Sequence, residues 1–214
     1  MDLSELSVRR FVETVASDAP APGGGSVAAL EASIGAALTG MVACLTQGRK
    51  KYADYAENAA LVQFEAEDLQ KQLLQLMDED SKAFNRVSAA FSLPKTTDEE
   101  KATRSAAIQA GLKACTETPL EMMRLGEAAI SLANDFLEKG FNQSSASDLG
   151  VAFLSLKSAV QGAWLNVLIN LASIKDPAFV REYRQKGEAI LSRSLPLAEA
   201  GYAKVLAIVQ PQQE

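Results

Sequence analysis

Histidine is absent from the 214-residue chain. Because histidine is the commonest general base in enzymes and the commonest zinc ligand, its absence excludes Ser–His and Cys–His nucleophile pairs. Catalysis in this chain must therefore use Asp, Glu, Lys, Tyr or Cys side chains, or backbone groups.

The chain also has few cysteines and no net positive charge. The two cysteines, Cys44 and Cys115, fit no metal-ligand spacing, so we predict two reduced thiols buried in helices of a cytoplasmic protein that holds no metal. The formal net charge of −6 argues against binding to nucleic acid or to an anionic membrane. The N-terminus, MDLSELSVRR, lacks the pattern of a signal peptide. The uncharged run 158–174 contains three amide side chains, which favours a buried helix over a membrane span.

Strand signals are missing as well. Alternation of β-branched and polar residues is not found, and Ala, Leu, Glu, Lys and Gln dominate. We predict an all-α fold, with one domain (1–214) of about six main helices around a buried central helix. The predicted helices cover 3–17, 26–46, 55–92, 97–140, 148–173 and the segment from the Asp176–Pro177 pair onward.

Short motifs mark where these helices start, end or bend. Thr97 and Glu100 have the spacing of a capping box. Gly140 should end the fourth helix. Pro119 lies inside the fourth predicted helix and should kink or split it, and Pro196 should kink the last one.

Three consecutive glycines precede the second helix, in the stretch PAPGGGSVAAL (20–30). A phosphate-binding loop needs a strand before the glycines and a Lys after them, and both are missing. Ser26 has the position of a helix cap. Because one glycine would be enough for a turn, the surplus indicates that another group closely approaches the amides at the helix start, where a carboxylate or a carbonyl-rich ring is favoured.

Asp80 lies on the apolar face of the third helix, whereas Asp78 and Glu79 do not. The apolar positions recur in steps of three and four: Leu69, Leu73, Leu76 or Met77, Phe84, Val87 and Phe91. A carboxylate on such a face is costly unless it is paired or hydrogen-bonded. Two interpretations are open: Asp80 binds a neighbouring helix end or an Arg, or it is a pocket carboxylate with a shifted pKa.

The predicted helix over 148–173 is apolar almost all round, yet polar residues share one narrow arc. These residues are Asp148, Ser155, Gly162, Asn166 and Ser173, with Asn170 nearby. A polar stripe on a buried helix needs hydrogen-bond partners, which either a packed network between helices or a ligand pocket would supply. Asp148 is alternatively a helix-start charge that follows the predicted cap Ser147.

Six segments together resemble the cyclodeaminase/cyclohydrolase family of folate enzymes. They are PAPGGGSVAAL (20–30), GRKKY (48–52), DEDSKAF (78–84), LPKTTDEEKATRSAAIQ (93–109), GFNQSSASDLGVA (140–152) and NVLIN (166–170). The resemblance implies a multihelical homodimer whose substrate is a tetrahydrofolate derivative, with no metal. Hydrolysis of 5,10-methenyltetrahydrofolate to 10-formyltetrahydrofolate is the preferred activity.

Two alternatives stay open. The first is a formiminotetrahydrofolate cyclodeaminase, which releases ammonia and depends on a separate formiminotransferase for its substrate. The second belongs to another class of protein: a helical dimer module that binds folate without catalysis.

The resemblance also implies roles for individual residues. Asp148 is the first candidate for the catalytic carboxylate near the one-carbon bridge, and Asp80 is the second. The pterin ring or the attacking water would be held by Asn142, Asn166 and Asn170. The p-aminobenzoyl-glutamate tail would be bound by Lys50, Tyr52, Lys95 and Arg104. The folate pocket would be lined or closed by Gly24, Gly25 and Ser26. Which of Arg49, Lys50 and Lys51 points inward stays open.

Overall fold

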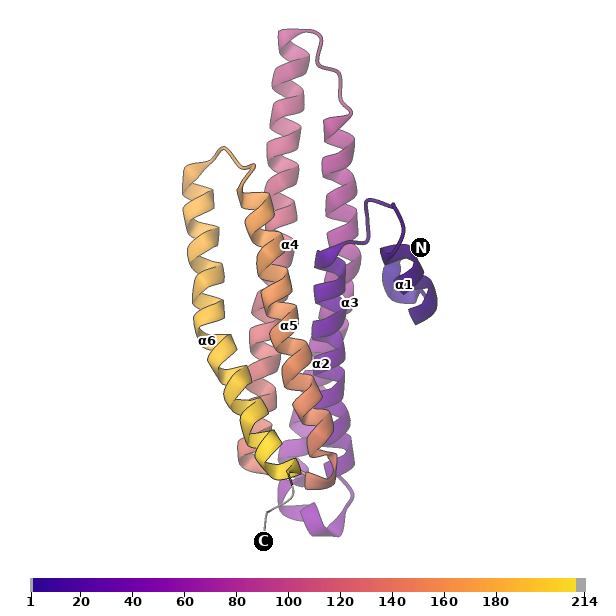
Figure 1. Cartoon of the computed structure of the whole chain (residues 1–214), viewed down its shortest axis with the longest axis vertical. Coiled ribbons are helices and arrows are strands. Elements are labelled where there is room, and N and C mark those ends of the chain that lie inside the picture. Colours follow the sequence, from indigo (N-terminus) through magenta and orange to yellow (C-terminus); the bar gives the residue numbers. More distant parts are fainter. Residues whose placement is uncertain (1, 211–214) are drawn as a thin grey trace.

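The computed structural model describes residues 2–210, and within that range it contains helices and no strands (Figure 1). Short 3-10 helices are labelled η. The elements in chain order are η1 (Leu3–Glu5), α1 (Val8–Val15), α2 (Gly24–Thr46), η2 (Lys50–Tyr55), α3 (Ala56–Phe91), α4 (Asp98–Lys139), η3 (Gln143–Ser145), α5 (Ala146–Leu171) and α6 (Pro177–Val209). The all-α prediction with six main helices is confirmed.

Helices α2 to α6 form one elongated bundle, and the short helix α1 lies at its side (Figure 1). Helix α5 packs against α2, α4 and α6, and α3 packs against α2 and α4. The ends of α3 and α4 that are joined by their connection extend beyond the other helices as a hairpin (Figure 1). Since α2 begins below this hairpin, its first turn lies beside the flank of α3.

The local start and stop signals act as predicted. The Thr97 side chain accepts a hydrogen bond from the Glu100 backbone N–H, and the Glu100 carboxylate accepts one from the Thr97 N–H, so the capping box is complete. Gly140 ends α4 with a φ of +108°, which favours glycine. The ring of Tyr55 lies where a side chain at this position would begin, at 2.6 Å from an ideal Cβ.

Three predicted boundaries were wrong by a few residues. The first predicted helix is split into η1 and α1, because Ser7 adopts an extended conformation and caps α1 by accepting from the Arg10 N–H. Helix α2 begins at Gly24 with Gly23 as its cap, so Ser26 does not cap it. Helix α5 begins at Ala146 instead of Asp148, because the preceding segment forms the single turn η3.

The two internal prolines do not split their helices. Helix α4 continues through Pro119 and α6 continues through Pro196. Helix α6 changes direction part-way along its length (Figure 1), as expected when a helix contains a proline.

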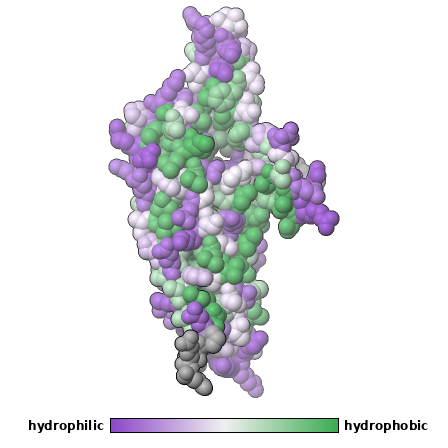
Figure 2. Space-filling model, in the orientation of Figure 1, coloured by the Kyte–Doolittle hydropathy of each residue, from purple (hydrophilic) through white to green (hydrophobic). Residues whose placement is uncertain are grey.

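One face of α5 is not buried, so the predicted central helix is not enclosed on all sides in a single chain. Apolar residues of α5 and of the neighbouring α2 form a joint surface, termed here the α2–α5 face. It consists of Ile34, Met41, Leu45, Val151, Leu154, Leu165 and Ile169, which are 38–71% exposed. Figure 2 shows apolar patches on the side of the molecule where α2 and α5 lie in Figure 1.

By length and composition alone, α2 and the segment Gln143–Leu171 are apolar enough to cross a membrane. The core helix of a soluble protein passes the same test, and both helices pack inside the bundle. The predicted absence of membrane association therefore stays a prediction.

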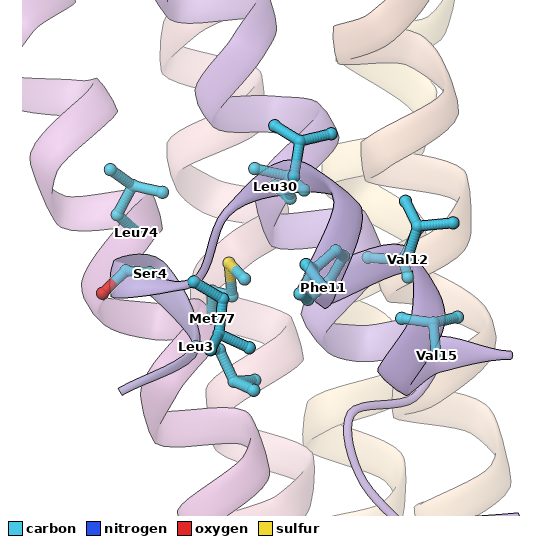
Figure 3. A pocket seen from close by; sticks show the side chains of 11 residues that line it. Leu3, Ser4, Phe11, Val12, Val15, Leu30, Leu74 and Met77 are labelled. Carbon is cyan, nitrogen blue, oxygen red and sulfur yellow. The ribbon is translucent and has the colours of Figure 1, made fainter. Parts of the chain in front are cut away.

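The N-terminal segment packs on α2 and α3 around an apolar cavity of about 330 Å³ (Figure 3). Phe11 is buried there beside Leu30 and Met77. Asp78, predicted to lie off the buried face, is in fact buried: its carboxylate accepts hydrogen bonds from the Ser4 backbone N–H (3.1 Å) and hydroxyl (2.6 Å). The prediction for Asp78 was wrong because its hydrogen-bond partner, Ser4, lies 74 residues away in the sequence.

Candidate functional site

A cavity of about 420 Å³ lies where α2 begins and α5 ends, against the flanks of α3 and α4. Its lining consists of Pro20, Ala21, Gly23, Gly24, Gly25, Asp80, Phe84, Val87, Phe91, Leu112, Cys115, Asn166, Ile169, Asn170 and Ser173. The glycine loop, the Asp80 carboxylate and the C-terminal half of the α5 polar stripe therefore meet in one place. Close approach at the glycine loop was inferred from the glycine surplus, and the cavity supplies the space for it.

Asp80 is held at the start of α2 by Ser26. The fully buried Ser26 hydroxyl donates to Asp80 Oδ2 at 2.9 Å. Burial raises the pKa of the Asp80 carboxyl above its ordinary value, although the Ser26 hydroxyl and backbone N–H act in the opposite direction. No Lys or Arg forms an ion pair with Asp80 within residues 2–210. Asp80 therefore binds a neighbouring helix end, as the first interpretation holds, and it also lines the cavity with a raised pKa, as the second holds. Ser26, predicted as a cap, is its hydrogen-bond partner.

The three glycines serve different purposes. An ideal Cβ at Gly25 would lie 2.4 Å from Asp80 Oδ1, so only glycine lets this carboxylate approach the helix. An ideal Cβ at Gly24 would lie 3.4 Å from Asn166 Nδ2, which is ordinary contact. An ideal Cβ at Gly23 would meet nothing within 4 Å. The glycine surplus is therefore explained chiefly by Gly25.

Asn166 and Asn170 present hydrogen-bond acceptors to the cavity. Asn166 Nδ2 donates to the Gly162 carbonyl at 2.9 Å. Asn170 Nδ2 donates to the carbonyls of Cys115 (2.7 Å) and Asn166 (2.8 Å). Since both N–H groups of Asn170 face carbonyl oxygens, its amide orientation is determined by the hydrogen-bond network. Neither Asn Oδ1 accepts a hydrogen bond from the described part of the chain, so both remain available to a ligand.

The outer part of the cavity is apolar, and a cation contacts one of its aromatic residues. Phe84 and Phe91 are 41% and 53% exposed, and they form the α3 side of the cavity with Val87. The Arg104 guanidinium lies 5.7 Å from the Phe91 ring centroid and donates to the Phe91 carbonyl at 3.0 and 3.2 Å. The cavity therefore has a polar inner end at Asp80 and a positive charge beside its aromatic wall.

The two thiols differ in their surroundings. Cys115 lines the cavity and is buried, and burial together with the nearby Asp80 charge raises its thiol pKa to about 11. It is therefore a neutral thiol at physiological pH. Cys44 is exposed on α2, so the prediction that both cysteines are buried was wrong for this residue. The described residues contain no cluster of three Asp, Glu or Cys side chains that would suit a metal ion.

Comparison with known proteins agrees with this arrangement. The family model described as formiminotransferase-cyclodeaminase matches residues 7–189. The chain belongs to this family.

Two relatives illustrate the range of the formiminotransferase-cyclodeaminase family. A methenyltetrahydrofolate cyclohydrolase of Methylorubrum extorquens is 40% identical over 199 residues, which cover 93% of this chain and 95% of the relative. A formimidoyltransferase-cyclodeaminase of Rattus norvegicus is 36% identical over 214 residues, which cover 99% of this chain but 38% of the rat protein. The chain thus corresponds to about two fifths of the longer relative.

A solved structure extends the comparison to three dimensions. The crystal structure of formiminotetrahydrofolate cyclodeaminase from Thermotoga maritima superposes with a TM-score of 0.87 at 26% identity, covering 98% of this chain and all of that one. The family fold therefore extends over nearly the whole chain.

Several of the predicted site residues lie at the opposite end of the bundle, near η2 and η3 (Figure 1). Lys50 and Tyr52 belong to η2, and Asp148 lies in the first turn of α5. Asp148 is 18 residues before Asn166 on the same helix, a separation of about 27 Å. Within a single chain, these three residues and the cavity do not meet.

Asn142 also lies at this lower end, where it joins the η3 turn to α2. Its backbone N–H donates to Thr46 Oγ1 at 3.0 Å, and its Nδ2 donates to the Leu45 carbonyl at 3.1 Å. Its Oδ1 accepts from Ser144. Because these bonds use the side chain inside the fold, the contacts of Asn142 are structural.

Lys95, the remaining predicted cation, is exposed in the connection between α3 and α4, on the same hairpin as Arg104. Sequence reasoning also missed several cavity residues, notably Cys115, Leu112 and Ile169. Phe84 and Phe91 were recognised only as members of an apolar stripe. Both rings are partly exposed, which shows that they form a cavity wall and not part of the core. A sequence pattern does not reveal this exposure.

Proposed function

We propose that the protein hydrolyses 5,10-methenyltetrahydrofolate to 10-formyltetrahydrofolate. The observation that carries this proposal is the Asp80 carboxylate, which lies in a cavity, has no ion-pair partner among residues 2–210 and has a raised pKa. The 40% identical relative from Methylorubrum extorquens, which is named for this reaction, matches almost end to end. In a chain without histidine, a carboxylate of this kind can serve as the general base.

Asp80 would act on both halves of the reaction. In the first half, water attacks the cationic methenyl carbon and gives a proton to the Asp80 carboxylate, which leaves a neutral tetrahedral carbon. In the second half, the bond from this carbon to N5 breaks, N5 takes the proton from Asp80, and the hydroxyl proton passes to solvent. The net products are 10-formyltetrahydrofolate and one proton.

The environment of Asp80 suits this use. A carboxyl whose pKa is raised towards the working pH is a stronger base than an ordinary surface carboxylate. The amide oxygens of Asn166 and Asn170 would accept hydrogen bonds from the pterin ring or the attacking water. The Ser26 hydroxyl would keep the carboxylate aligned.

The glutamate tail of the substrate would lie towards the α3–α4 hairpin. Phe84 and Phe91 offer an apolar surface for the aromatic ring between pterin and glutamate. Arg104 and Lys95 on the hairpin would pair with the carboxylates. Lys50 and Tyr52 lie at the other end of the helix bundle, so a contact from them to the same ligand would require a second subunit.

The second candidate is a formiminotetrahydrofolate cyclodeaminase. It is favoured by the structural match to the Thermotoga maritima protein of that name and by the longer relative from Rattus norvegicus. In that reaction N10 attacks the formimino carbon and ammonia leaves, and Asp80 would again move the proton. The substrate would have to come from a formiminotransferase.

An assay of the purified protein with each substrate in parallel distinguishes the two reactions. We expect the methenyl absorbance to decay faster than it does in buffer alone, and we expect little ammonia from formiminotetrahydrofolate. Ammonia release without methenyl decay would favour the cyclodeaminase instead. Turnover of neither substrate, with folate binding retained, would identify a non-catalytic binding module.

We also propose that the protein is a homodimer joined through the α2–α5 face. The exposed apolar side chains of the α2–α5 face indicate a surface that a partner covers. Leu165→Glu and Ile34→Glu should therefore shift the protein from dimer to monomer in sedimentation experiments, since a charge is costly in a buried interface. Leu61→Glu, at an exposed position on α3, is the control. A wild-type protein that is monomeric at micromolar concentration would contradict this proposal.

A further inference from the structure

Pro119 is buried inside α4 and lies one helical turn after Cys115. In a regular α-helix the N–H of residue 119 would donate to the carbonyl of residue 115. Proline has no N–H, and its ring pushes the carbonyl four residues earlier away from the helix axis. Pro119 therefore removes the helical partner of the Cys115 carbonyl, which belongs to a residue of the cavity lining.

A side chain from another helix occupies this carbonyl. Asn170 of α5 donates to it through Nδ2 at 2.7 Å, the shortest of the hydrogen bonds made by the two cavity asparagines. The second N–H of the same amide donates to the Asn166 carbonyl at 2.8 Å. With both N–H groups held by carbonyl oxygens, the amide of Asn170 has one orientation, and its Oδ1 is left as an acceptor.

We propose that Pro119 is a positioning residue for substrate recognition: it frees the Cys115 carbonyl, which fixes the Asn170 amide so that its oxygen faces the ligand as an acceptor. This inference rests on the proposed function, because its ligand is the reduced folate. The Asp80 carboxylate and the oxygens of Asn166 and Asn170 offer acceptors to the ligand, whereas the second N–H of Asn166 and the Ser173 hydroxyl offer donors. The fixed Asn170 oxygen therefore selects for a heterocycle edge that presents an N–H donor to it, such as that of a pterin.

Without the fixed amide, this selectivity would weaken. In Pro119→Ala the restored N–H donates to the Cys115 carbonyl along the helix axis, which turns this oxygen away from α5. Asn170 then loses its interhelical anchor, and its amide is free to rotate and to present N–H groups to the ligand. Ligand binding weakens when N–H groups of Asn170 face N–H groups of the ligand, because neither side then has a hydrogen-bond acceptor.

The test is a double-mutant cycle on the Michaelis constant. Pro119→Ala should raise KM about tenfold, equivalent to about 1.4 kcal/mol, with kcat changed less than twofold. Asn170→Leu should raise KM by a similar factor, and the double variant should be no worse than Asn170→Leu alone. Pro196→Ala, at an exposed proline inside α6, is the matched control and should change neither constant. An unchanged KM in Pro119→Ala, or additive effects in the double variant, would overturn the proposal.

Folding and function are separated by two further measurements. The melting temperature of each variant is compared with that of the wild type, and Pro119→Gly, which also restores the N–H, replaces Pro119→Ala if the latter is unfolded. If the wild-type protein turns over neither folate, the proposed function has failed. The same cycle is then measured as the Kd for 5-formyltetrahydrofolate, where a coupled tenfold loss supports the role of Pro119 and additive losses refute it.

Discussion

Replacing Gly25 by alanine tests how closely the Asp80 carboxylate must approach α2. The new Cβ would lie 2.4 Å from Asp80 Oδ1 and 2.7 Å from Cγ and Oδ2. Since ordinary contact begins near 3.4 Å, the carboxylate must move by about 1 Å. A displacement of about 1 Å at a reacting group costs about 100-fold in rate, or about 2.7 kcal/mol of activation free energy. We therefore expect Gly25→Ala to lower kcat/KM about 100-fold.

The glycine series supplies its own controls. Gly23→Ala meets nothing within 4 Å and has an ordinary backbone conformation, so it should keep full activity. Gly24→Ala makes ordinary contact with Asn166 and should lose less than tenfold. The assay is methenyl decay at several substrate concentrations, and the melting temperature of each variant shows whether the fold persists.

The predicted role of the close contact between Asp80 and α2 fails if a folded Gly25→Ala protein is as active as the wild type. Tight packing of Asp80 against α2 would then have no role in the reaction. It also fails if Gly23→Ala is as damaging as Gly25→Ala, because the loss would then reflect the loop conformation and not the carboxylate.

Three further perturbations follow from the same cavity. Asp80→Asn should lower kcat by 10²–10⁴-fold and, because burial raises the Asp80 pKa, should raise the melting temperature at pH 8 by about 2–4 °C. Ionisation of Asp80 destabilises the folded protein only as pH rises above about 3.9, the ordinary pKa of Asp. The rise in melting temperature of Asp80→Asn should therefore vanish near pH 4. An equal rise at pH 4 and pH 8 would refute the pKa shift. With iodoacetamide at pH 8, the native protein should be alkylated at Cys44 only, and the denatured protein at Cys115 as well. Rapid alkylation of Cys115 in the native protein would contradict a buried thiol with a pKa of about 11. Arg104→Ala should raise KM up to about tenfold and leave kcat unchanged, and Arg104→Lys should raise KM less. Equal KM values for the wild type and both variants would show that the glutamate tail binds elsewhere.

Much of the fold follows from local patterns in the sequence. The capping box at Thr97 and the glycine at position 140 depend on neighbours within a few residues, and each acts as predicted. The last helix likewise begins at the Asp176–Pro177 pair, where Asp176 is the cap. Periodicity also placed Asp80 and Asn166 on inward faces, because the faces of a helix are determined by spacing alone.

The site itself depends on contacts that spacing does not encode. Ser26 is separated from Asp80 by 54 residues, and its local sequence fits a helix cap as well as a buried partner. Asp78 was misjudged in the same way, since the Ser4 contact spans 74 residues. Periodicity shows which side of a helix is polar, but it does not show which other helix lies opposite.

The most direct test of the account is a crystal structure of the protein with 5-formyltetrahydrofolate, which resembles the product and resists hydrolysis. We predict that the pterin lies between Asp80 and the two cavity asparagines, with the one-carbon group within about 2.6–3.2 Å of the Asp80 carboxylate or of one bridging water. The tail should run past Phe91 towards Arg104. A ligand bound instead beside Asp148 and Lys50 of the same chain, with the Asp80 cavity empty, would contradict the central claim.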